Sequence, residues 1–216
     1  MRYVMMNAHN LDEAIKIWKS TNNTLGMNYM IASANDLKSG KPAVALETMR
    51  NYTAFFFDND KRENGTMFKD PRTNKTYQAG FSMPEALFRT NHAYDPTINK
   101  FRRDPLIAEN DDSMIRYKIL KDGFNWYKNE GIEMGEEQSL NLTAILGDKG
   151  SEYFMSCKKK ADGVNVISVA FEPESLKMWA GFEYSSGKTF RSACCGVYVE
   201  MDMAPWLNGM NNLISE

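Results

Sequence analysis

Four consecutive residues, Arg89-Thr90-Asn91-His92, carry side chains that could act on a carbonyl group. When an acyl group passes through a covalent intermediate, an oxyanion develops, and an asparagine side-chain N–H at a strand end is a suitable donor to it. His92 also suggests a Cys/His or Ser/His pair. The alternative is a turn in which the Asn91 side chain bonds to nearby backbone, and such a string taken alone favours the turn.

Cysteine and histidine give little evidence of a reactive centre. The three cysteines, Cys157, Cys194 and Cys195, lack a metal-ligand spacing such as C-x-x-C. They are expected to be core residues or to form one disulfide from Cys157 to one of the adjacent pair, which leaves one thiol over. His9 and His92 are the two histidines, and they form no H-x-x-x-H or H-E-x-x-H arrangement. We therefore expect no metal and no cofactor.

The composition predicts a globular protein with an ordinary core. The chain has 216 residues, 43% of them apolar, and a formal net charge of -2, so there is no chain-wide basic field to attract nucleic acid. The longest basic run, Lys158-Lys159-Lys160, is expected to be a solvated turn. No window approaches the roughly 20 apolar residues that span a bilayer. We expect neither a nucleic-acid partner nor a membrane span.

Asparagine-linked glycosylation acceptors are frequent in this sequence. Random placement would give roughly two Asn-x-Ser/Thr sequons. The excess favours a lysosomal or secreted protein, whereas a cytoplasmic protein rich in asparagine would acquire sequons by chance. On a secretory route, glycans are expected in the most polar stretch, at Asn64 and Asn74. The five sequons begin at Asn22, Asn51, Asn64, Asn74 and Asn141.

The first half of the chain predicts a helix followed by an antiparallel meander. Asn10 and Glu13 form a capping pair, and apolar residues then recur at helical spacing for about ten residues. Three β-like runs follow, separated by turn residues, at residues 27–34, 43–49 and 52–57. The alternation of strands with short turns predicts neighbouring antiparallel strands.

Two features of this half of the sequence have more than one interpretation. Glu47 lies at the end of an apolar strand, where its carboxylate is either buried and paired, and able to organise a site, or exposed to solvent. Residues 59–80 are polar and turn-rich, and are expected to form a long loop outside the core. Such a loop would be a lid or an insertion.

The second half predicts two helices and a strand hairpin. A helix at residues 112–128 would bury Ile115, Ile119 and Trp126 and pack on a sheet face. With no repeat or linker, we expect a single domain over residues 1–216, of the α+β class with helix and antiparallel-sheet layers. The remaining predicted elements are a helix at 138–146, strands at 164–171 and 176–182 joined by a short turn, and a last strand at 195–201.

The order of these elements and several local strings resemble one known family. This is the penicillin acyltransferase-like branch of the N-terminal-nucleophile hydrolases, typified by acyl-CoA:6-aminopenicillanic acid acyltransferase. The resemblance covers most of the chain, and Arg89-Thr90-Asn91-His92 is its most specific string. The other strings are Arg2-Tyr3-Val4 with Leu11–Ile15, Asn28–Ala32 leading to Val44–Thr48, Ser113–Tyr117, and Ser168–Pro173 with Leu176–Gly181.

The resemblance implies a fold and a set of site residues. The fold would be an αββα sandwich of antiparallel sheets, incomplete at the N-terminus. Asn91 would be the catalytic oxyanion donor, at the end of a central strand and pointing into a cleft. Arg116 would share that cleft and support the acyl carbonyl or a neighbouring carboxylate, or else be a surface charge. His92 would be structural or lie at the substrate rim.

The resemblance also implies where the nucleophile lies. Members of this class use a cysteine at the N-terminus of a mature subunit, whose own α-amino group is the base. Met1 cannot do that chemistry, and a cysteine inside the chain has no such base beside it. The nucleophile is therefore expected on a segment missing from this chain, carried by an N-terminal companion fragment. The substrate would be a small-molecule amide or acyl compound.

Two other functions are compatible with these sequence patterns. The first is a non-catalytic structural or interaction protein that retains the fold. The second is a lysosomal lipid hydrolase of the acid ceramidase-like or phospholipase B-like kind, in which Phe55, Phe56 and Phe57 would line an acyl pocket. Phenylalanine runs in strands are more often core residues than pocket walls.

Overall fold

The computed structural model describes residues 1–101, 107–149, 166–186 and 190–206. Helices and sheets are both present, and every strand pair in these described ranges is antiparallel. The predicted α+β class is thus confirmed. The chain forms two compact units, residues 1–121 and residues 122–216, which are described separately. A single domain over residues 1–216 stays a prediction.

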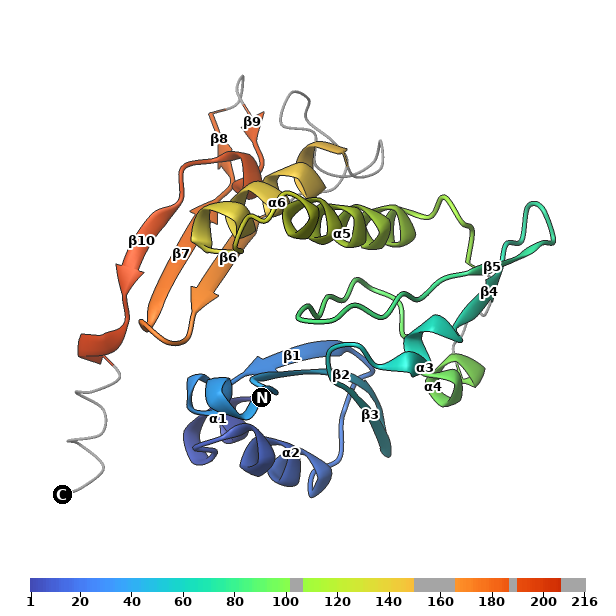
Figure 1. Ribbon diagram of the computed structural model, residues 1–216, viewed down its shortest axis with the longest axis horizontal. Helices are drawn as coiled ribbons and strands as arrows, with labels where there is room; N and C mark the ends of the chain where they lie inside the picture. The colour runs from blue at the N-terminus through green and yellow to red at the C-terminus, as the bar shows by residue number, and fades with distance from the viewer. Residues whose placement is uncertain (102–106, 150–165, 187–189, 207–216) are drawn as a thin grey trace. The chain divides into compact units, whose positions relative to one another are not determined.

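A three-stranded antiparallel sheet lies at the centre of the first unit (Figure 1). Its strands follow one another in the order β1-β2-β3, so the predicted meander is confirmed. Tyr29 of β1 pairs with Leu46 of β2, which pairs with Phe55 of β3. The second strand has the predicted bounds, whereas the first and third are shorter than predicted; the strands are β1 (Asn28–Ala32), β2 (Ala43–Met49) and β3 (Tyr52–Phe56).

Two helices near the N-terminus, α1 (Arg2–Asn7) and α2 (Leu11–Lys19), cover one face of this sheet (Figure 1). The Asn10 side chain accepts a hydrogen bond from the Glu13 backbone N–H at 2.9 Å, which confirms the predicted capping pair. Trp18 packs against Tyr29, with ring centroids 4.9 Å apart. The buried core between helices and sheet consists of Val4, Leu11, Ala14, Trp18, Ile31, Val44 and Leu46.

The prediction of a long loop outside the core at residues 59–80 is wrong. The segment contains helix α3 (Lys61–Asn64) and a hairpin of β4 (Met67–Lys69) and β5 (Thr76–Gln78). Phe68 and Glu63 are buried, and Gly80 packs so closely on the Glu63 carbonyl that a Cβ there would collide with it. The polar composition misled the prediction because much of the segment's burial involves charged and hydroxyl side chains that find distant partners.

Helix α5 (Asp112–Asn129) confirms the helix predicted at 112–128 but buries different residues. Trp126 is 54% exposed, so its predicted burial is wrong, Ile115 and Ile119 are half-buried, and the fully buried positions are Met114 and Tyr117. The Tyr117 ring lies 4.5 Å from the Tyr94 ring, centroid to centroid. Aromatic contacts with a segment distant in sequence, rather than helical spacing alone, decide which face of this helix is covered.

The second unit combines helix α6 (Glu136–Lys149) with a sheet in the strand order β10-β7-β6. The predicted hairpin is confirmed by β6 (Ile167–Glu172) and β7 (Lys177–Phe182), whereas α6 is longer than the predicted helix. The predicted last strand at 195–201 is a 3₁₀ turn, η2 (Ala193–Cys195), followed by β10 (Val199–Asp202). The smaller elements are η1 (Ala34–Ser39) and α4 (Pro96–Lys100) in the first unit, and β8 (Tyr184–Ser185) and β9 (Phe190–Arg191) in the second.

One face of the second unit's sheet carries apolar side chains throughout. Ile167 pairs with Phe182, and both are more than half exposed, as are Phe171 and Val199 on the same face. The opposite face holds the buried Ser168 and Trp179. The strand register places on this apolar face Ile167, Val169, Phe171, Met178, Ala180, Phe182, Val199 and Met201, of which Ala180 is buried.

The structure describes two of the three cysteines. Cys195 is disulfide-bonded, and the Sγ of the buried Cys194 lies 3.7 Å from that of Cys195. Cys157 and the basic run 158–160 lie outside the described residues. Among the helices that the structure describes, none is long and apolar enough to cross a membrane.

All five sequon asparagines are exposed, but their settings differ. Asn51 lies in the turn between β2 and β3, and Asn74 lies near the tip of the β4–β5 hairpin with a φ of 58°. The Asn64 side chain is engaged with Ser82, both donating to its hydroxyl and accepting from its backbone N–H. Asn141 lies within α6. A hairpin tip presents the acceptor most openly, so Asn74 is the better of the two glycan positions named above.

Candidate functional site

The segment from Arg89 to Asp95 lies in no strand, so the prediction that Asn91 ends a central strand is wrong. Its main chain is instead held by side chains from elsewhere in the first unit. The Asn28 Nδ2 donates to the Thr90 carbonyl at 2.6 Å and to the His92 carbonyl at 2.9 Å. The Asn91 backbone N–H donates to the Ser113 Oγ at 2.9 Å. These three bonds fix the backbone on both sides of Asn91.

Glu47 holds the two ends of the same segment. Its Oε2 accepts hydrogen bonds from the backbone N–H groups of Tyr94 and Asp95, each at 2.7 Å. Its Oε1 forms an ion pair with the Arg89 Nε at 2.9 Å. The Glu47 side chain is fully buried, so of the two alternatives left open, the buried and paired carboxylate is correct.

Arg89 links Glu47 to a second buried carboxylate. Its NH2 group lies 2.5 Å from Glu63 Oε1, and the Tyr117 hydroxyl donates to Glu63 Oε2 at 3.3 Å. The guanidinium also stacks over the Phe56 ring, 4.7 Å from its centroid. The three charged side chains, which we call the Glu47–Arg89–Glu63 cluster, are each at most 5% exposed. Two carboxylates share one guanidinium, so the cluster carries a negative charge when both are ionised.

Burial shifts the titration of this cluster. It raises the pKa values of Glu47 and Glu63 because the charged form loses hydration, and the attraction of Arg89 offsets this only in part. Burial would lower the pKa of Arg89, but the two carboxylates outweigh it and raise that pKa. Burial and the neighbouring Glu63 also raise the pKa of the Tyr117 hydroxyl, so it stays a neutral donor.

The raised pKa values predict that the protein is more stable at mildly acidic than at neutral pH. An acid whose pKa is higher in the folded state binds its proton more tightly there. Its contribution to stability is therefore lost as pH rises from the ordinary glutamic acid value, about 4.3, through the raised ones. Urea titrations should give a larger free energy of unfolding at about pH 5 than at about pH 7.

A Glu63→Gln variant provides the control, because it removes one of the two shifted carboxylates and leaves the histidines unchanged. Its free energy of unfolding should depend less on pH over this interval than that of the original chain. Arg62 lowers the pKa of Asp60, and backbone N–H donors lower the pKa of Asp70. Protonation of these two carboxylates would destabilise the protein, but only at a pH below the interval compared here. A stability that rises from acidic to neutral pH would contradict the prediction.

Asn91 lines a pocket of about 270 Å³ in the first unit. Asn28 and Thr48 add polar groups, and the other walls are largely apolar. Asn91 is exposed at the pocket rather than buried. It thus stands on a fixed loop beside an open concave surface. The pocket is lined by Gly26, Met27, Asn28, Thr48, Met49, Asn91, Ala93, Ile98 and Phe101.

The structure does not bring Arg116 or His92 to this pocket. Arg116 pairs with Asp112 one turn before it, through Nε at 2.8 Å and NH2 at 2.7 Å, as a helix-surface pair does. His92 is buried, with its ring 6.2 Å from that of Phe68 and its Nε2 3.8 Å from Asp111 Oδ1. The placement expected for Arg116 is therefore wrong, and of the two roles considered for His92 the structural one fits.

The phenylalanine run of β3 belongs to the core. Phe56 is fully buried and packs with Ala45, Ala54 and Ile98. Phe55 and Phe57 pack against the core below α2. None of the three lines the pocket at Asn91, the larger pocket at Asp95 or the pocket at Asn22.

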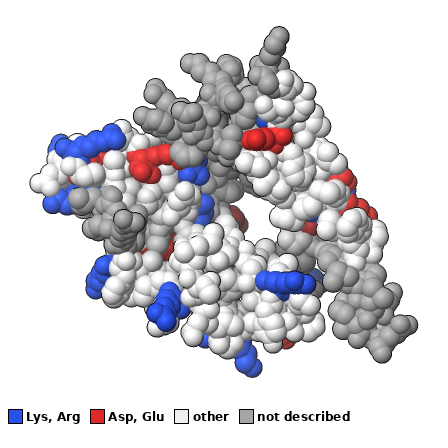
Figure 2. Space-filling model, turned by 180° about the vertical axis from the view of Figure 1, so that it is seen from behind, with Lys and Arg blue, Asp and Glu red and all other residues white. Residues whose placement is uncertain are grey.

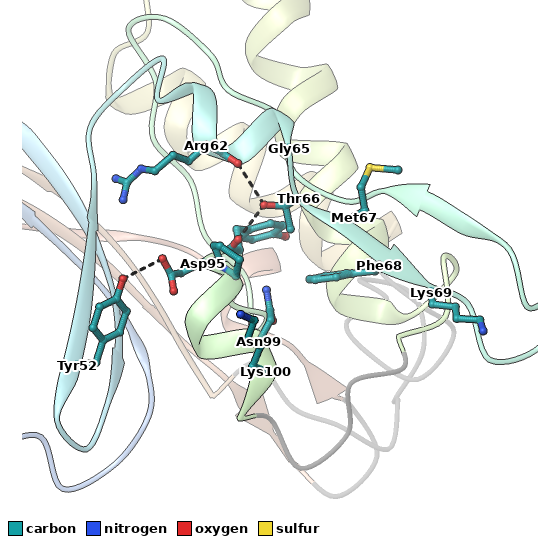
Figure 3. Close-up of a pocket in the computed structure, with 12 residues that line it drawn as sticks. Tyr52, Arg62, Gly65, Thr66, Met67, Phe68, Lys69, Asp95, Asn99 and Lys100 are labelled. Atoms are coloured by element: carbon teal, nitrogen blue, oxygen red, sulfur yellow. Dashed lines mark hydrogen bonds between the residues drawn. The ribbon is translucent and has the colours of Figure 1, made fainter.

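A second and larger pocket, of about 880 Å³, lies next to the same loop (Figure 3). Across it the Tyr52 hydroxyl donates to Asp95 Oδ2 at 3.2 Å, and the Thr66 hydroxyl donates to the Tyr94 carbonyl at 2.8 Å. No sequence pattern indicated this pocket, since its walls come from β4, α4 and the ends of other elements. It is lined by Tyr52, Arg62, Gly65, Thr66, Met67, Phe68, Lys69, Tyr94, Asp95, Pro96, Asn99 and Lys100.

Sequence reasoning missed the residues that hold the loop. No role was predicted for Arg89 itself, although an arginine two residues before a candidate oxyanion donor is a reasonable candidate for a positioning role. Asn28 and Ser113 also belong to the segments that carry the family resemblance, but no pattern indicated that they would contact residues 90–92. Glu63 had no sequence signal at all, because its polar segment was assigned to a loop.

Comparisons with protein-family models, with curated proteins and with solved structures found no match to this chain. The described residues contain no group of His, Cys, Asp and Glu side chains arranged to hold a metal. On the face shown in Figure 2, Lys and Arg side chains are scattered among uncharged and acidic residues. The geometry around Asn91 is therefore the main evidence for the function of this chain.

Proposed function

We propose that this chain supplies the oxyanion-stabilising part of an N-terminal-nucleophile amidohydrolase or acyltransferase acting on a linear amide. The observation that carries the proposal is the fixed loop around Asn91. Glu47, Asn28 and Ser113 hold its main chain by five hydrogen bonds, and Asn91 stands at a pocket. A backbone fixed in this way limits the positions that the Asn91 side chain can reach, and oxyanion stabilisation favours donors that need little rearrangement during the reaction.

In the proposed reaction, the thiol of an N-terminal cysteine on another segment attacks the amide carbonyl, and its own α-amino group takes the proton. The carbonyl oxygen becomes an oxyanion and accepts a hydrogen bond from the Asn91 side-chain N–H. The C–N bond breaks, the amine leaves with the proton, and a thioester remains. Water then releases the acid in hydrolysis, or a second amine takes the acyl group in transfer.

The fold supports the sandwich architecture that this proposal includes. In the first unit, α1 and α2 cover one face of the β1-β2-β3 sheet. In the second unit, α6 packs against β6, and one face of the sheet is apolar throughout. A sheet with a helix layer and a fully apolar face suits stacking on another sheet. We accordingly propose an αββα sandwich of the N-terminal-nucleophile type.

The proposed nucleophile can be tested by trapping the thioester. The product of the parent gene, including any sequence encoded upstream of Met1, would be incubated with a series of acyl p-nitroanilides and analysed by intact-mass and peptide mass spectrometry. We expect p-nitroaniline release and an acyl adduct on a peptide that begins with cysteine. No adduct and no release across the series would overturn the proposal and favour the non-catalytic alternative.

The cell compartment is part of the same proposal. The five sequons favour a lysosomal or secreted protein, and an acidic compartment would suit a protein whose buried carboxylates have raised pKa values. The lipid-hydrolase alternative has no specific support, because Phe55, Phe56 and Phe57 are core residues. An acyl p-nitroanilide series with increasing chain length would reveal such a preference directly.

A further inference from the structure

The larger pocket and the Asn91 pocket lie on opposite sides of α4. Ile98 and Phe101 line the Asn91 pocket, whereas Pro96, Asn99 and Lys100 line the larger one. Residues at these spacings point to opposite faces of a helical turn. The larger pocket is therefore a separate site, and what it binds does not depend on the function proposed for Asn91.

Much of the wall of the larger pocket is apolar. Phe68 alone of the three β4 residues is buried, so its ring faces inward, while Met67 and Lys69 are exposed residues of the pocket lining. Figure 3 shows Phe68 reaching towards the middle of the pocket and Lys69 turned away from it. Tyr94 and Pro96 extend this surface. A volume of about 880 Å³ accommodates a ligand with a sizeable apolar body.

Most polar groups of the pocket are already engaged. Asp95 accepts from the Tyr52 hydroxyl and from the backbone N–H groups of Thr97 and Ile98, which it caps. Arg62 is held by a two-oxygen contact with Asp60. Neither side chain is therefore free to recognise a ligand without losing an existing partner.

Two neighbouring residues at the end of α4 are not engaged. The Asn99 Oδ1 is buried and has no hydrogen-bond partner among the described residues, which costs free energy unless a ligand or water donates to it. Lys100 has no ion-pair partner among the described residues, and its side chain is exposed. Figure 3 shows the two side chains next to each other below Thr66 and Phe68. The pocket thus presents one unused acceptor and one unused cation beside an apolar wall.

We propose that this pocket binds an amphipathic carboxylate that has an N–H donor next to the carboxylate, as in an N-acyl amino acid. The carboxylate pairs with the Lys100 ammonium group, and the amide N–H donates to Asn99 Oδ1. The acyl chain lies against Phe68 and Pro96. The buried Asn99 Oδ1 becomes accessible when the side-chain amide turns towards the pocket, and neither polar contact displaces a hydrogen bond or ion pair among the described residues.

Calorimetric titration of the full chain with three probes tests the assignment. N-octanoylglycine has the chain, the N–H and the charge, octanoate lacks the N–H, and N-methyloctanamide lacks the charge. N-octanoylglycine should bind most tightly, by roughly fivefold over octanoate and roughly tenfold over the neutral amide. Equal affinities for the three probes, or no binding of N-octanoylglycine, would overturn the proposal.

Single variants separate the two polar contacts. Lys100→Gln should weaken N-octanoylglycine roughly tenfold and leave the neutral amide unchanged, while Asn99→Leu should remove the preference for N-octanoylglycine over octanoate. Lys75→Gln is the matched control, because that exposed lysine between β4 and β5 does not line the pocket, and its affinities should equal those of the original chain. Unchanged binding in Lys100→Gln, or equal losses in Lys75→Gln and Lys100→Gln, would contradict the site. Lys100 is exposed, so this variant tests the proposal even if Asn99→Leu does not fold.

Discussion

Replacing Arg89 with methionine should lower the free energy of unfolding by about 3–5 kcal/mol at neutral pH. The guanidinium is 3% exposed and is the counter-ion of both Glu47 and Glu63, which are also buried. Its removal leaves two carboxylates close together without compensation and out of contact with water. Urea denaturation followed by circular dichroism would measure the loss, which should shrink at acidic pH because the carboxylates can then take up protons.

Two further variants make this result specific to buried charge. Arg62→Met removes an arginine of the same unit that is paired with Asp60 but 49% exposed, and it should cost no more than about 1 kcal/mol. The triple variant Arg89→Met, Glu47→Gln and Glu63→Gln should recover part of the loss, since no uncompensated charge remains. If Arg89→Met were no more damaging than Arg62→Met, the Glu47–Arg89–Glu63 cluster would not be the structural centre inferred above.

Replacing Asn91 with alanine in the active enzyme should lower turnover by about 10²–10³-fold, as the loss of one oxyanion donor typically does. The side chain is exposed, and the contacts that hold the loop run through the Asn91 backbone rather than its amide group. The free energy of unfolding should therefore change by no more than about 0.5 kcal/mol. Kinetics with an acyl p-nitroanilide and urea denaturation of the same sample would give both numbers.

The Arg116→Ala variant tests, in the same experiment, whether Arg116 has the catalytic role suggested by the sequence or is the helix-surface residue seen in the structure. Arg116 pairs with Asp112 on the helix and does not line the pocket with Asn91, so turnover should stay within about twofold of the original value. A large loss in Arg116→Ala would restore the role that the sequence suggested. Unchanged turnover in Asn91→Ala would remove the mechanistic proposal and leave the fold.

Elements defined by local patterns were predicted from the sequence. The meander β1-β2-β3 and the β6–β7 hairpin follow from short apolar runs separated by turn residues, and the start of α2 follows from the Asn10 and Glu13 pair. In each case the partners are near in sequence, so spacing and residue type carry the information. The residues that could do chemistry in the string 89–92 were also visible, as was the ambiguity of Glu47.

Tertiary structure alone decided how these pieces meet. Glu47 is buried because Arg89 and the backbone of residues 94 and 95 satisfy it, and Glu63 is buried because Arg89 and Tyr117 do. A buried charge is tolerated only when such partners are present, and the partners here are many residues away in the chain. No local pattern records them, so the sequence could place neither the cluster nor the core packing of residues 59–80.

The position of Asn91 shows the same division most clearly. Its residue type, a side-chain N–H donor, is a property of the sequence. The prediction placed Asn91 at the end of a strand. It lies instead on a loop that is fixed by Asn28, Glu47 and Ser113 from three separate elements. A polar side chain can be aimed equally well by a strand or by such a loop, since both fix the backbone through hydrogen bonds. Which of them does so depends on contacts that form only when the distant segments pack together.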